Sequence, residues 1–403
     1  MVRRGEFETL QNRGLPLGIL VDTNNKQKLG DVSRFEYIEH FDFSRPAHEL
    51  VKLVTEVQHR FGIRCLFNVI EFYVAQTAYV AEQLGIPNLS SESARLCLDK
   101  NLMRDRFRQR VGPHSTARFQ QIHSEGELVH VAEEIGYPVF LQPSNVSASM
   151  WSTRNNDKDS LLRNYRSIVE DVPKYYERLG KKETKLSVLL AEYVEGKNTS
   201  IDCLVQQDGS VVTTPIVDVL TGRDVGINDY HHFARILPSS LTTEEQAELE
   251  QLAIEGVRSL DMTCCAAHVE FIGNRLGEIA ARPGGNRARI LELAYGVDEL
   301  YACYQALTGQ APTIAKSRHN AAAIVTPFPA RSGTIQAINY LEQLSELPGY
   351  LYHEVRAQLG TTVGLASGGY RAPLYIEFVS TIESDVRASV NTVASWTDLY
   401  VVE

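Results

Sequence analysis

The fold of this chain is decided by EIAARPGGNRAR at residues 278–289, taken together with AAHVEF at 266–271. Both segments have the apolar spacing of short strands, and Gly273-Asn274 lies between them as a turn signal. The two segments therefore predict a hairpin that presents two carboxylates, Glu270 and Glu278. The length of the turn decides whether the two side chains share a face.

A two-residue turn would place Glu270 opposite Gly277 and direct Glu278 to the other face of the hairpin. A three-residue turn would place Glu270 directly across from Glu278, and this is the turn we expect. Opposed side chains lie about 4.5–5.5 Å apart at Cβ, so two carboxylates there repel each other unless a cation lies between them. Two carboxylates with phosphate oxygens nearby suit Mg²⁺. On this register Arg282 shares their face; the alternative is an exposed hairpin with ordinary surface acids.

The composition indicates a globular protein and argues against two classes of surface. The chain has 403 residues, enough for two to four packed units, with 43% hydrophobic and 22% charged residues. Its net charge of −10 argues against a general nucleic-acid or membrane surface, because such surfaces are basic. The six cysteines are scattered, and we expect free thiols in a reducing compartment, the cytoplasm. We also expect no membrane span and no secretory signal.

Three further segments extend the pattern, and together the segments resemble the ATP-grasp superfamily. LDKNLMRDRF (98–107) resembles the segment whose lysine touches the nucleotide phosphates, with Lys100 as the counterpart. FLQPSNVSAS (140–149) resembles the strand and small-residue loop that close over ATP, and AEYVEGKNTSIDCLV (191–205) resembles the hinge strand that holds adenine. The two carboxylates and RPGG (282–285) resemble the metal-binding end. Within the superfamily, the chain is similar to carboxylate–amine ligases of the L-amino-acid ligase type.

This resemblance implies an α/β (α+β) ATP-grasp fold in four parts. We expect an N-terminal parallel α/β domain, a small and a large ATP-grasp subdomain, and a C-terminal subdomain, with boundaries at 1–97, 98–190, 191–315 and 316–403. The large subdomain would contain an antiparallel-sheet core and the Mg²⁺ and ATP site. In the N-terminal part, strand-like runs alternate with a helical run, which predicts a parallel sheet; these runs are 16–24, 35–43 and 63–70, and the helix is 48–62.

Three more expectations concern particular elements. The chain begins with a segment that has the pattern of a helix, so we expect either a truncated start or an N-terminal sheet that lacks its first strand. Residues 151–185 are polar and predict a solvent-facing helix with mobile ends. Residues 241–260 predict a core helix that begins with a capping box formed by Thr242 and Glu245.

The resemblance also implies an activity, that of an ATP-dependent carboxylate–amine ligase with an amino acid as at least one substrate. ATP would phosphorylate one carboxylate, and the amine of the second substrate would displace phosphate to form an amide. Phosphoryl transfer mainly requires positioning and charge neutralisation. Glu270 and Glu278 would hold Mg²⁺, and Lys100 would contact the phosphates. The partners would be small-molecule carboxylates and amines, and the chain could form a homodimer.

The catalytic residues predicted beside the metal are Arg282, Arg287 and His232. Arg282 would neutralise the acyl-phosphate or the substrate carboxylate, with a structural salt bridge as its alternative. Arg287 follows the paired glycines 284 and 285, which allow close approach of a ligand, although a simple turn explains them nearly as well. His232 would be the base that takes a proton from the attacking amine, with neighbouring His231 as the other candidate.

The nucleotide-binding residues predicted from the resemblance are Lys100, Phe140, Gln142, Ser147, Ser149, Glu192, Tyr193, Val194 and Asn198. The loop serines would close over phosphate, and backbone groups of Glu192 and Val194 would meet the adenine edge. Phe140 and Leu204 would sandwich the ring. The segment 221–238 would complete the cleft, with Tyr230, Arg223 and Arg235 as further candidates.

Three positions depart from the family pattern. Gln142 stands where a lysine is usual, Asn198 stands where an acid usually meets the ribose, and Ala280 stands where asparagine often supports a second Mg²⁺. Gln142 matters most, because a charged hydrogen bond is roughly twice as strong as a neutral one. Gln142, Ala280 and the absent first strand favour an alternative function, a nucleotide-binding pseudoenzyme that acts as a regulatory or structural partner.

Overall fold

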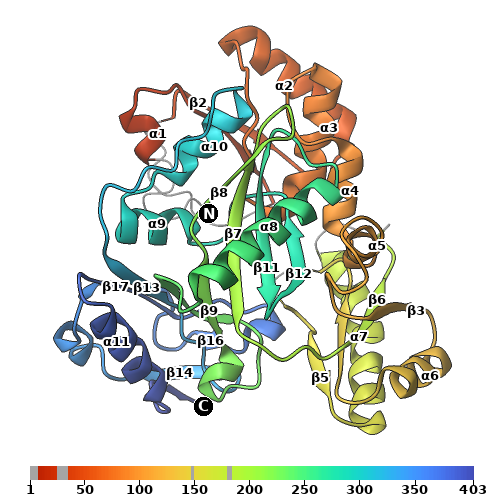
Figure 1. The fold of residues 1–403 in the computed structure, drawn as a ribbon, viewed down its shortest axis with the longest axis vertical. Helices are drawn as coiled ribbons and strands as arrows, with labels where there is room; N and C mark the ends of the chain where they lie inside the picture. The colour runs from red at the N-terminus through yellow and green to blue at the C-terminus, as the bar shows by residue number, and fades with distance from the viewer. Residues whose placement is uncertain (1–7, 25–34, 147–148, 179–183) are drawn as a thin grey trace.

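The computed structural model describes residues 8–24, 35–146, 149–178 and 184–403, and its elements form four sheets (Figure 1). The largest sheet has nine strands, in the order β12-β11-β7-β9-β10-β13-β17-β15 with β8 beside β7. The others are a four-stranded sheet β3-β6-β4-β5, a three-stranded sheet β16-β14-β18 and the pair β1-β2. In Figure 1 the small yellow subdomain and the blue C-terminal part lie on either side of the central strands.

The elements have the following bounds. The helices are α1 (Glu8–Asn12), α2 (Ala47–Phe61), α3 (Val74–Leu84), α4 (Ser91–Leu98), α5 (Lys100–Arg110), α6 (Glu125–Ile135), α7 (Lys158–Arg178), α8 (Thr243–Ser259), α9 (Arg287–Tyr295), α10 (Glu299–Leu307) and α11 (Glu383–Ser395), with 3-10 turns η1 (Glu71–Tyr73), η2 (Gly222–Val225), η3 (Gln343–Glu346) and η4 (Ala366–Gly368). The strands are β1 (Gly18–Asp22), β2 (Tyr37–Phe41), β3 (Phe119–Ile122), β4 (Val139–Pro143), β5 (Thr153–Asn155), β6 (Val188–Glu192), β7 (Asn198–Val205), β8 (Val211–Thr213), β9 (Val217–Thr221), β10 (His232–Leu237), β11 (Cys265–Ile272), β12 (Arg275–Ala280), β13 (Ala321–Val325), β14 (Gly333–Ile338), β15 (Tyr350–Val355), β16 (Thr362–Val363), β17 (Leu374–Ser380) and β18 (Tyr400–Val402).

The N-terminal part contains a parallel pair of strands, and one predicted strand is absent. β1 and β2 pair in parallel, as the alternating pattern predicts. Residues 63–70 were predicted to form a strand, and the structure has no strand there. Their apolar side chains pack into the core instead, and the Leu66 carbonyl accepts from the Asn88 side-chain amide at 2.8 Å. An apolar run indicates that its side chains are buried, but it does not show whether its backbone pairs with another strand.

The four-stranded sheet has one face packed on helices and one face turned toward the rest of the protein. Its outer face packs against α6 and α7 through a core that includes Leu141, Leu161 and Leu190. Helix α7 was predicted to face solvent, but it buries five side chains along one face, namely Leu161, Tyr165, Ile168, Val172 and Tyr176. The inner face carries Phe140 and Gln142, because strand register places them opposite Ala191 and Leu189.

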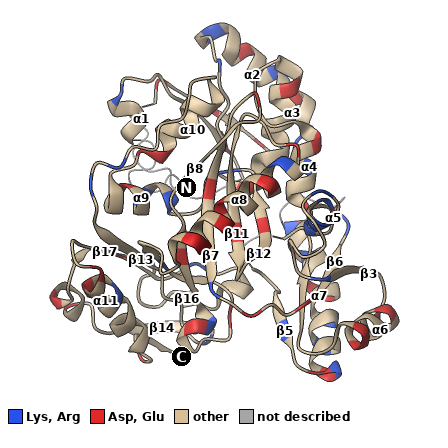
Figure 2. Ribbon diagram, in the orientation of Figure 1, with Lys and Arg blue, Asp and Glu red and all other residues tan. Residues whose placement is uncertain are grey.

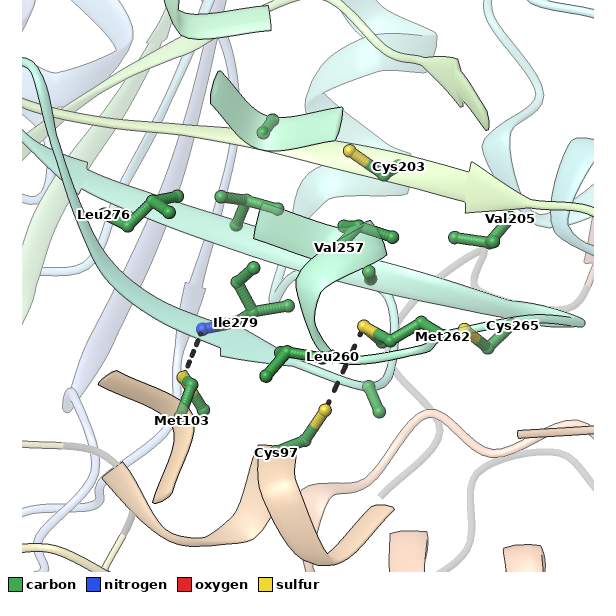
Figure 3. Close-up of a cluster of buried hydrophobic side chains, with 14 of the residues drawn as sticks. Cys97, Met103, Cys203, Val205, Val257, Leu260, Met262, Cys265, Leu276 and Ile279 are labelled. Carbon is green, nitrogen blue, oxygen red and sulfur yellow. Dashed lines mark hydrogen bonds between the residues drawn. The ribbon is translucent and has the colours of Figure 1, made fainter. Parts of the chain in front are cut away.

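A helix-covered core supports the end of the nine-stranded sheet formed by β11 and β12 (Figure 3). The predicted core helix is α8, and its capping box between Thr242 and Glu245 is confirmed. Helix α5 covers the edge strand β12, where the Ile279 N–H donates to Met103 Sδ at 3.2 Å. This contact holds α5 against an edge that has no further strand beside it.

The large sheet continues into the C-terminal part of the chain. β10 pairs with β13, and β13 pairs with β17, so strands from both sides of the expected boundary at residues 315 and 316 share one sheet. Helix α11 packs against this extension through Val386, Val390 and Val393. Within the described residues, no helix is both long and apolar enough to cross a membrane.

Replacing Leu260 with alanine should lower the free energy of unfolding by about 2–5 kcal/mol, because the side chain is fully buried in the core of Figure 3 and its removal leaves a cavity. Leu359→Ala is the matched control, since Leu359 is 66% exposed and should change stability by less than about 0.5 kcal/mol. Urea unfolding followed by circular dichroism measures both. Equal losses in the two variants would contradict the assignment of this core.

Candidate nucleotide and metal site

The hairpin β11-β12 places Glu270 directly opposite Glu278, as predicted, but by a different route. The turn has two residues, because Ile272 pairs with Arg275 and Phe271 pairs with Leu276. The predicted three-residue turn is therefore wrong. The register then shifts by one residue after Phe271, so that Gly277 is an extra residue in β12. This β-bulge has the same effect on parity as a longer turn.

Glycine is suited to both special positions of this hairpin. Gly273 in the turn has φ 57°, a left-handed conformation that glycine adopts without steric cost. A Cβ on Gly277 would lie 3.3 Å from the Glu270 carbonyl oxygen, so a side chain at the bulge would press on the opposite strand.

Glu270 is held by a chain of buried polar groups. Its Oε1 lies 3.2 Å from His268 Nε2, and His268 Nδ1 lies 2.5 Å from Asp202 Oδ1 on β7. Both ring nitrogens thus face carboxylates. Burial opposes a charge on His268, but Asp202 and Glu270 outweigh it and raise its pKa. Burial likewise opposes ionisation of Glu270, while the hydrogen bond and the positive charge of His268 hold its pKa below the usual range.

The same aspartate also fixes the RPGG turn. The Gly284 N–H donates to Asp202 Oδ2 at 2.7 Å. A Cβ on Gly284 would lie 2.3 Å from His268 Nδ1 and 2.3 Å from Arg287 Cγ, so only glycine fits without moving these side chains. The paired glycines therefore let the turn close on the His268–Asp202 pair, beside the metal ligand predicted at Glu270.

The structure contradicts the prediction that Arg287 contacts a substrate. Arg287 is completely buried, and its guanidinium bonds to groups inside the protein. Nη2 donates to Thr214 Oγ1 at 2.9 Å and to the Pro215 carbonyl at 2.8 Å, and Nε lies 3.5 Å from Asp202 Oδ1. Asp202 also faces Glu299, whose pKa is raised well above its ordinary value, first by burial and then by the charge of Asp202. Arg287 thus balances a buried carboxylate.

Lys100 connects the second carboxylate to the small-residue loop. Its Nζ lies 3.2 Å from Glu278 Oε2 and donates to the Val146 carbonyl at 3.0 Å, and the side chain is buried. Figure 2 shows several basic residues on α5, the helix that covers β12. Lys100 is therefore not a solvated surface lysine of the helix. The ammonium group lies between β12, which carries Glu278, and the small-residue loop. Phosphates are expected at this position.

Arg282 forms an ion pair with the N-terminal part of the chain. Its Nε lies 2.8 Å from Glu71 Oε2 at the start of η1. Burial raises the pKa of Glu71, with Arg282 lowering it and Glu278 raising it further. The salt bridge considered for Arg282 is therefore present. It also places Arg282 among Glu71, Glu278 and Lys100, so charges of alternating sign surround the end of β12.

The small-residue loop and Gln142 lie on the inner side of the small sheet. Ser149 has φ 54°, and its carbonyl accepts from the Ser152 N–H at 3.1 Å. Ser147 lies outside the described residues. Gln142 is buried, and its Oε1 accepts from Ser152 Oγ at 3.5 Å, a weak bond. No cation replaces the lysine expected at this position on β4.

Two backbone donors of the hinge are already in use, since the Tyr193 N–H donates to the Pro138 carbonyl at 3.3 Å. The Glu192 N–H donates to the Arg118 carbonyl at 2.9 Å, so a contact with adenine would have to use the Glu192 carbonyl. The Glu192 carboxylate pairs with Arg118 and Arg275. The Tyr193 ring lies under Arg154, whose Cζ is 4.5 Å from the ring centroid. Val194 packs on the inner face of the small sheet.

The predicted adenine sandwich is only half present. Phe140 lies on the inner face, where the Tyr230 ring meets it edge-on at 5.1 Å. Leu204 was predicted as the second wall, but it is fully buried on β7 against Ala302 and Cys303, so this part of the prediction is wrong. The prediction placed Leu204 on the nucleotide side of β7, whereas its side chain lies in the core on the other side. Asn198 begins β7 opposite Ile272, near the hairpin turn.

Both histidines of segment 221–238 have hydrogen-bond partners among neighbouring side chains. His231 is buried, with Nδ1 3.2 Å from Asp229 Oδ1 and its ring against Phe328. Arg235 Nη2 donates to His232 Nδ1 at 3.0 Å, and His232 Nε2 lies 3.9 Å from Glu270 Oε1. Burial lowers the pKa of His232 to about 4. Its neutral ring has its lone pair occupied by Arg235, so the base role is not carried into our proposal.

The carboxylate pair suits a metal that arrives with other oxygen ligands. In the part of the chain that the structure describes, no cluster of three or more His, Cys, Asp or Glu side chains could hold a metal alone. Glu270 and Glu278 supply two carboxylates on one face of the hairpin. Lys100 lies between Glu278 and the small-residue loop. Such a donor set fits Mg²⁺, which usually binds through one or two carboxylates together with phosphate oxygens and water.

Three residues of this site were missed in the sequence: Glu71, Asp202 and His268. A signal existed for each. Glu71 follows the apolar run that ends at Ile70, and polar residues at the end of such runs often line a site. Asp202 and His268 interrupt strands that are otherwise apolar, and charged residues are rarely buried without a partner. Only the pairing of β7 with β11, which aligns Asp202 with His268, reveals that they are partners.

Comparison with known proteins identifies the fold. Residues 135–286 match the model of the ATP-grasp domain. The chain is 26% identical over 278 residues to an alanine–anticapsin ligase of Bacillus subtilis strain 168, covering 65% of this chain and 57% of the relative. It is 23% identical over 161 residues to a D-alanine–D-alanine ligase of Acetivibrio thermocellus, which covers 38% of each chain.

A solved structure is similar over nearly the whole chain. The crystal structure of an L-amino acid ligase from Bacillus licheniformis superposes with a TM-score of 0.81 at 18% identity, covering 98% of this chain and 95% of that chain. The chain therefore has the ATP-grasp fold and carries an ATP-grasp domain. It spans 57% of the length of the anticapsin ligase that it matches, so an activity of the whole protein remains a proposal.

Replacing Arg287 with methionine should lower the free energy of unfolding by about 3–5 kcal/mol, because it leaves a buried carboxylate without its guanidinium partner. The matched control is Arg163→Met on the exposed side of α7, which should change stability by less than about 0.5 kcal/mol. Guanidinium unfolding of both variants gives the comparison. If Arg287→Met were as stable as the unchanged protein and lost only substrate affinity, the predicted substrate contact would have to be reinstated.

Proposed function

We propose that this protein is an ATP-dependent carboxylate–amine ligase that joins two substrates through an acyl-phosphate, with an amino acid as at least one of them. The observation that carries the proposal is the opposed pair Glu270 and Glu278, with Lys100 connecting Glu278 to the small-residue loop. Such an arrangement gathers two metal-binding carboxylates and a phosphate-binding cation in one cleft. The kinship with amino-acid ligases supports the same chemistry.

Each charged group of the cleft has a task in this reaction. Glu270 and Glu278 would hold Mg²⁺, which supplies neutralisation of the phosphate charge when it is bound. Lys100 would contact the phosphate oxygens from the loop side. Arg282 would share its charge between Glu71 and the acyl-phosphate, since its guanidinium has further N–H donors beyond the one facing Glu71. His268 orients Glu270 and takes no part in bond making.

The amine must lose a proton to attack, and no side chain named above is a convincing base. His232 is neutral but has its lone pair occupied by Arg235. We therefore propose that the proton leaves to a phosphate oxygen or to water. The alternative function, a nucleotide-binding pseudoenzyme, draws on Gln142, Ala280 and the first strand that the N-terminal sheet was expected to lack. The alanine–anticapsin and D-alanine–D-alanine relatives are named as ligases.

The proposal extends to the setting of the enzyme. Its substrates would be small-molecule carboxylates and amines, and its cofactors ATP and Mg²⁺. A cytoplasmic location fits the six free cysteines, five of which are buried thiols. A homodimer is part of the proposal and is testable by size-exclusion chromatography with light scattering.

The protein should release ADP and phosphate when incubated with ATP, Mg²⁺ and pairs of amino acids, and mass spectrometry should detect the matching amide products. Glu278→Gln should abolish turnover and keep the fold, because it removes a metal ligand while the amide can still accept from Lys100. Glu248→Gln, an exposed change on α8, is the control and should be fully active. The ligase proposal fails if a broad panel of amino and carboxylic acids gives no ADP above the ATP-only background.

Replacing Gln142 with lysine should tighten ATP binding by about 1–2 kcal/mol, the usual scale of one charged hydrogen bond. The position lies on the inner face of the small sheet, opposite Leu189. Gln120→Lys on β3 adds the same charge on the opposite face and should leave ATP affinity unchanged. Isothermal titration calorimetry measures both. Unchanged or weaker binding in Gln142→Lys would mean that the site is arranged around glutamine.

A further inference from the structure

Helix α5 carries a second cation, Arg104, which lies beside strand β12. Arg104 is one helical turn beyond Lys100, so the two side chains lie on the same face of α5, with Cβ atoms roughly 5–6 Å apart. Arg104 Nη2 lies 3.4 Å from the Gly277 carbonyl, which is the bulged residue next to Glu278. Its Cζ lies 6.0 Å from the centroid of the Phe119 ring on β3.

These contacts place the guanidinium between the small sheet and the edge of the large sheet. Phe119 pairs with Ala191, and so does Phe140, while Gln142 pairs with Leu189 two residues away. Cross-strand partners share a face, so Phe119 lies on the same inner face as Phe140 and Gln142. The other wall is β12, which carries Glu278. Arg104 therefore lies between the inner face of the small sheet and strand β12.

The charge of Arg104 is poorly satisfied in this position. The residue is buried, with 6% of its surface exposed, and its Nε and Nη1 have no hydrogen-bond partner among the described residues. The single bond from Nη2 is long. Burial lowers the pKa of Arg104 to about 10, with the charge of Glu278 acting in the opposite direction. A buried guanidinium with two free donors is costly unless an anion completes its surroundings.

We propose that Arg104 is a nucleotide-binding residue whose free N–H groups contact phosphate oxygens of the bound nucleotide. This inference rests on the proposed function, because it assumes that ATP binds between these two sheets. Lys100 and Arg104 then supply two positive charges from one helix face, whereas the facing wall offers the neutral Gln142. The planar guanidinium suits phosphate because it presents donors in pairs.

Calorimetric titrations with ATP, ADP, AMP and adenosine test the assignment in the absence of any second substrate. Arg104→Met should weaken ATP and ADP about ten- to a hundredfold, the range expected for a charged hydrogen bond, and should leave adenosine unchanged. Arg108→Met is the matched control: Arg108 lies one turn further along α5, 5.4 Å from the same Phe119 ring, and is exposed. It should bind every nucleotide like the unchanged protein.

A purely structural role gives a different result. If Arg104 only stabilised the β12 bulge, Arg104→Met would weaken adenosine and ATP alike, and this outcome would overturn the proposal. So would an unchanged ATP affinity. Arg104→Lys keeps the charge, so it should fold even if the methionine variant does not. It should bind ATP with intermediate affinity and adenosine with unchanged affinity. Equal losses of affinity for both ligands would again contradict the proposal. An unchanged protein that binds no ATP would count against the proposed function instead.

Discussion

The buried carboxylate of Asp202 is the group on which the rest of this site depends. It accepts from the Gly284 N–H, lies within 2.5 Å of His268 Nδ1 and faces the Arg287 guanidinium. Removing a carboxylate from water is costly, and only several partners together compensate for it. The groups that satisfy this one charge therefore come from the neighbouring strand β11, the RPGG turn and the first turn of α9. Through them, the proposed metal ligand Glu270 and the turn that carries Arg282 are both anchored to Asp202.

A second constraint comes from the edge of the large sheet. β12 is the last strand of the sheet. Its outer edge bonds to residues 115 and 116 at Leu276, and α5 covers it through Met103. This packing brings the first turns of the helix, with Lys100 and Arg104, against the strand that carries Glu278. The cations and the carboxylate thus approach each other because a helix covers this edge strand. In the proposed ligase, the same contact would place positive charge beside the nucleotide phosphates.

The sequence predicted those parts of the site that lie close together along the chain. Glu270 and Glu278 belong to one hairpin, and their pairing followed from strand alternation, although the parity came from a bulge at Gly277 and not from the turn. Core helices such as α8 were also evident, because an apolar face and a capping box are local patterns. By contrast, residues 63–70 have strand-like composition without a strand neighbour, and sequence alone cannot supply the missing partner.

The sequence by itself determined the class of fold, the carboxylate pair and the position of Lys100, because these depend on spacing within a few residues or on ordered segments that resemble a known family. Tertiary structure decided that Arg287 is an internal counter-charge, that Leu204 belongs to the core and that His268 and Asp202 support Glu270. The reason is physical. The surroundings of a charge, and hence its cost and its role, are set by strands and helices that are remote in sequence and meet only in the folded chain.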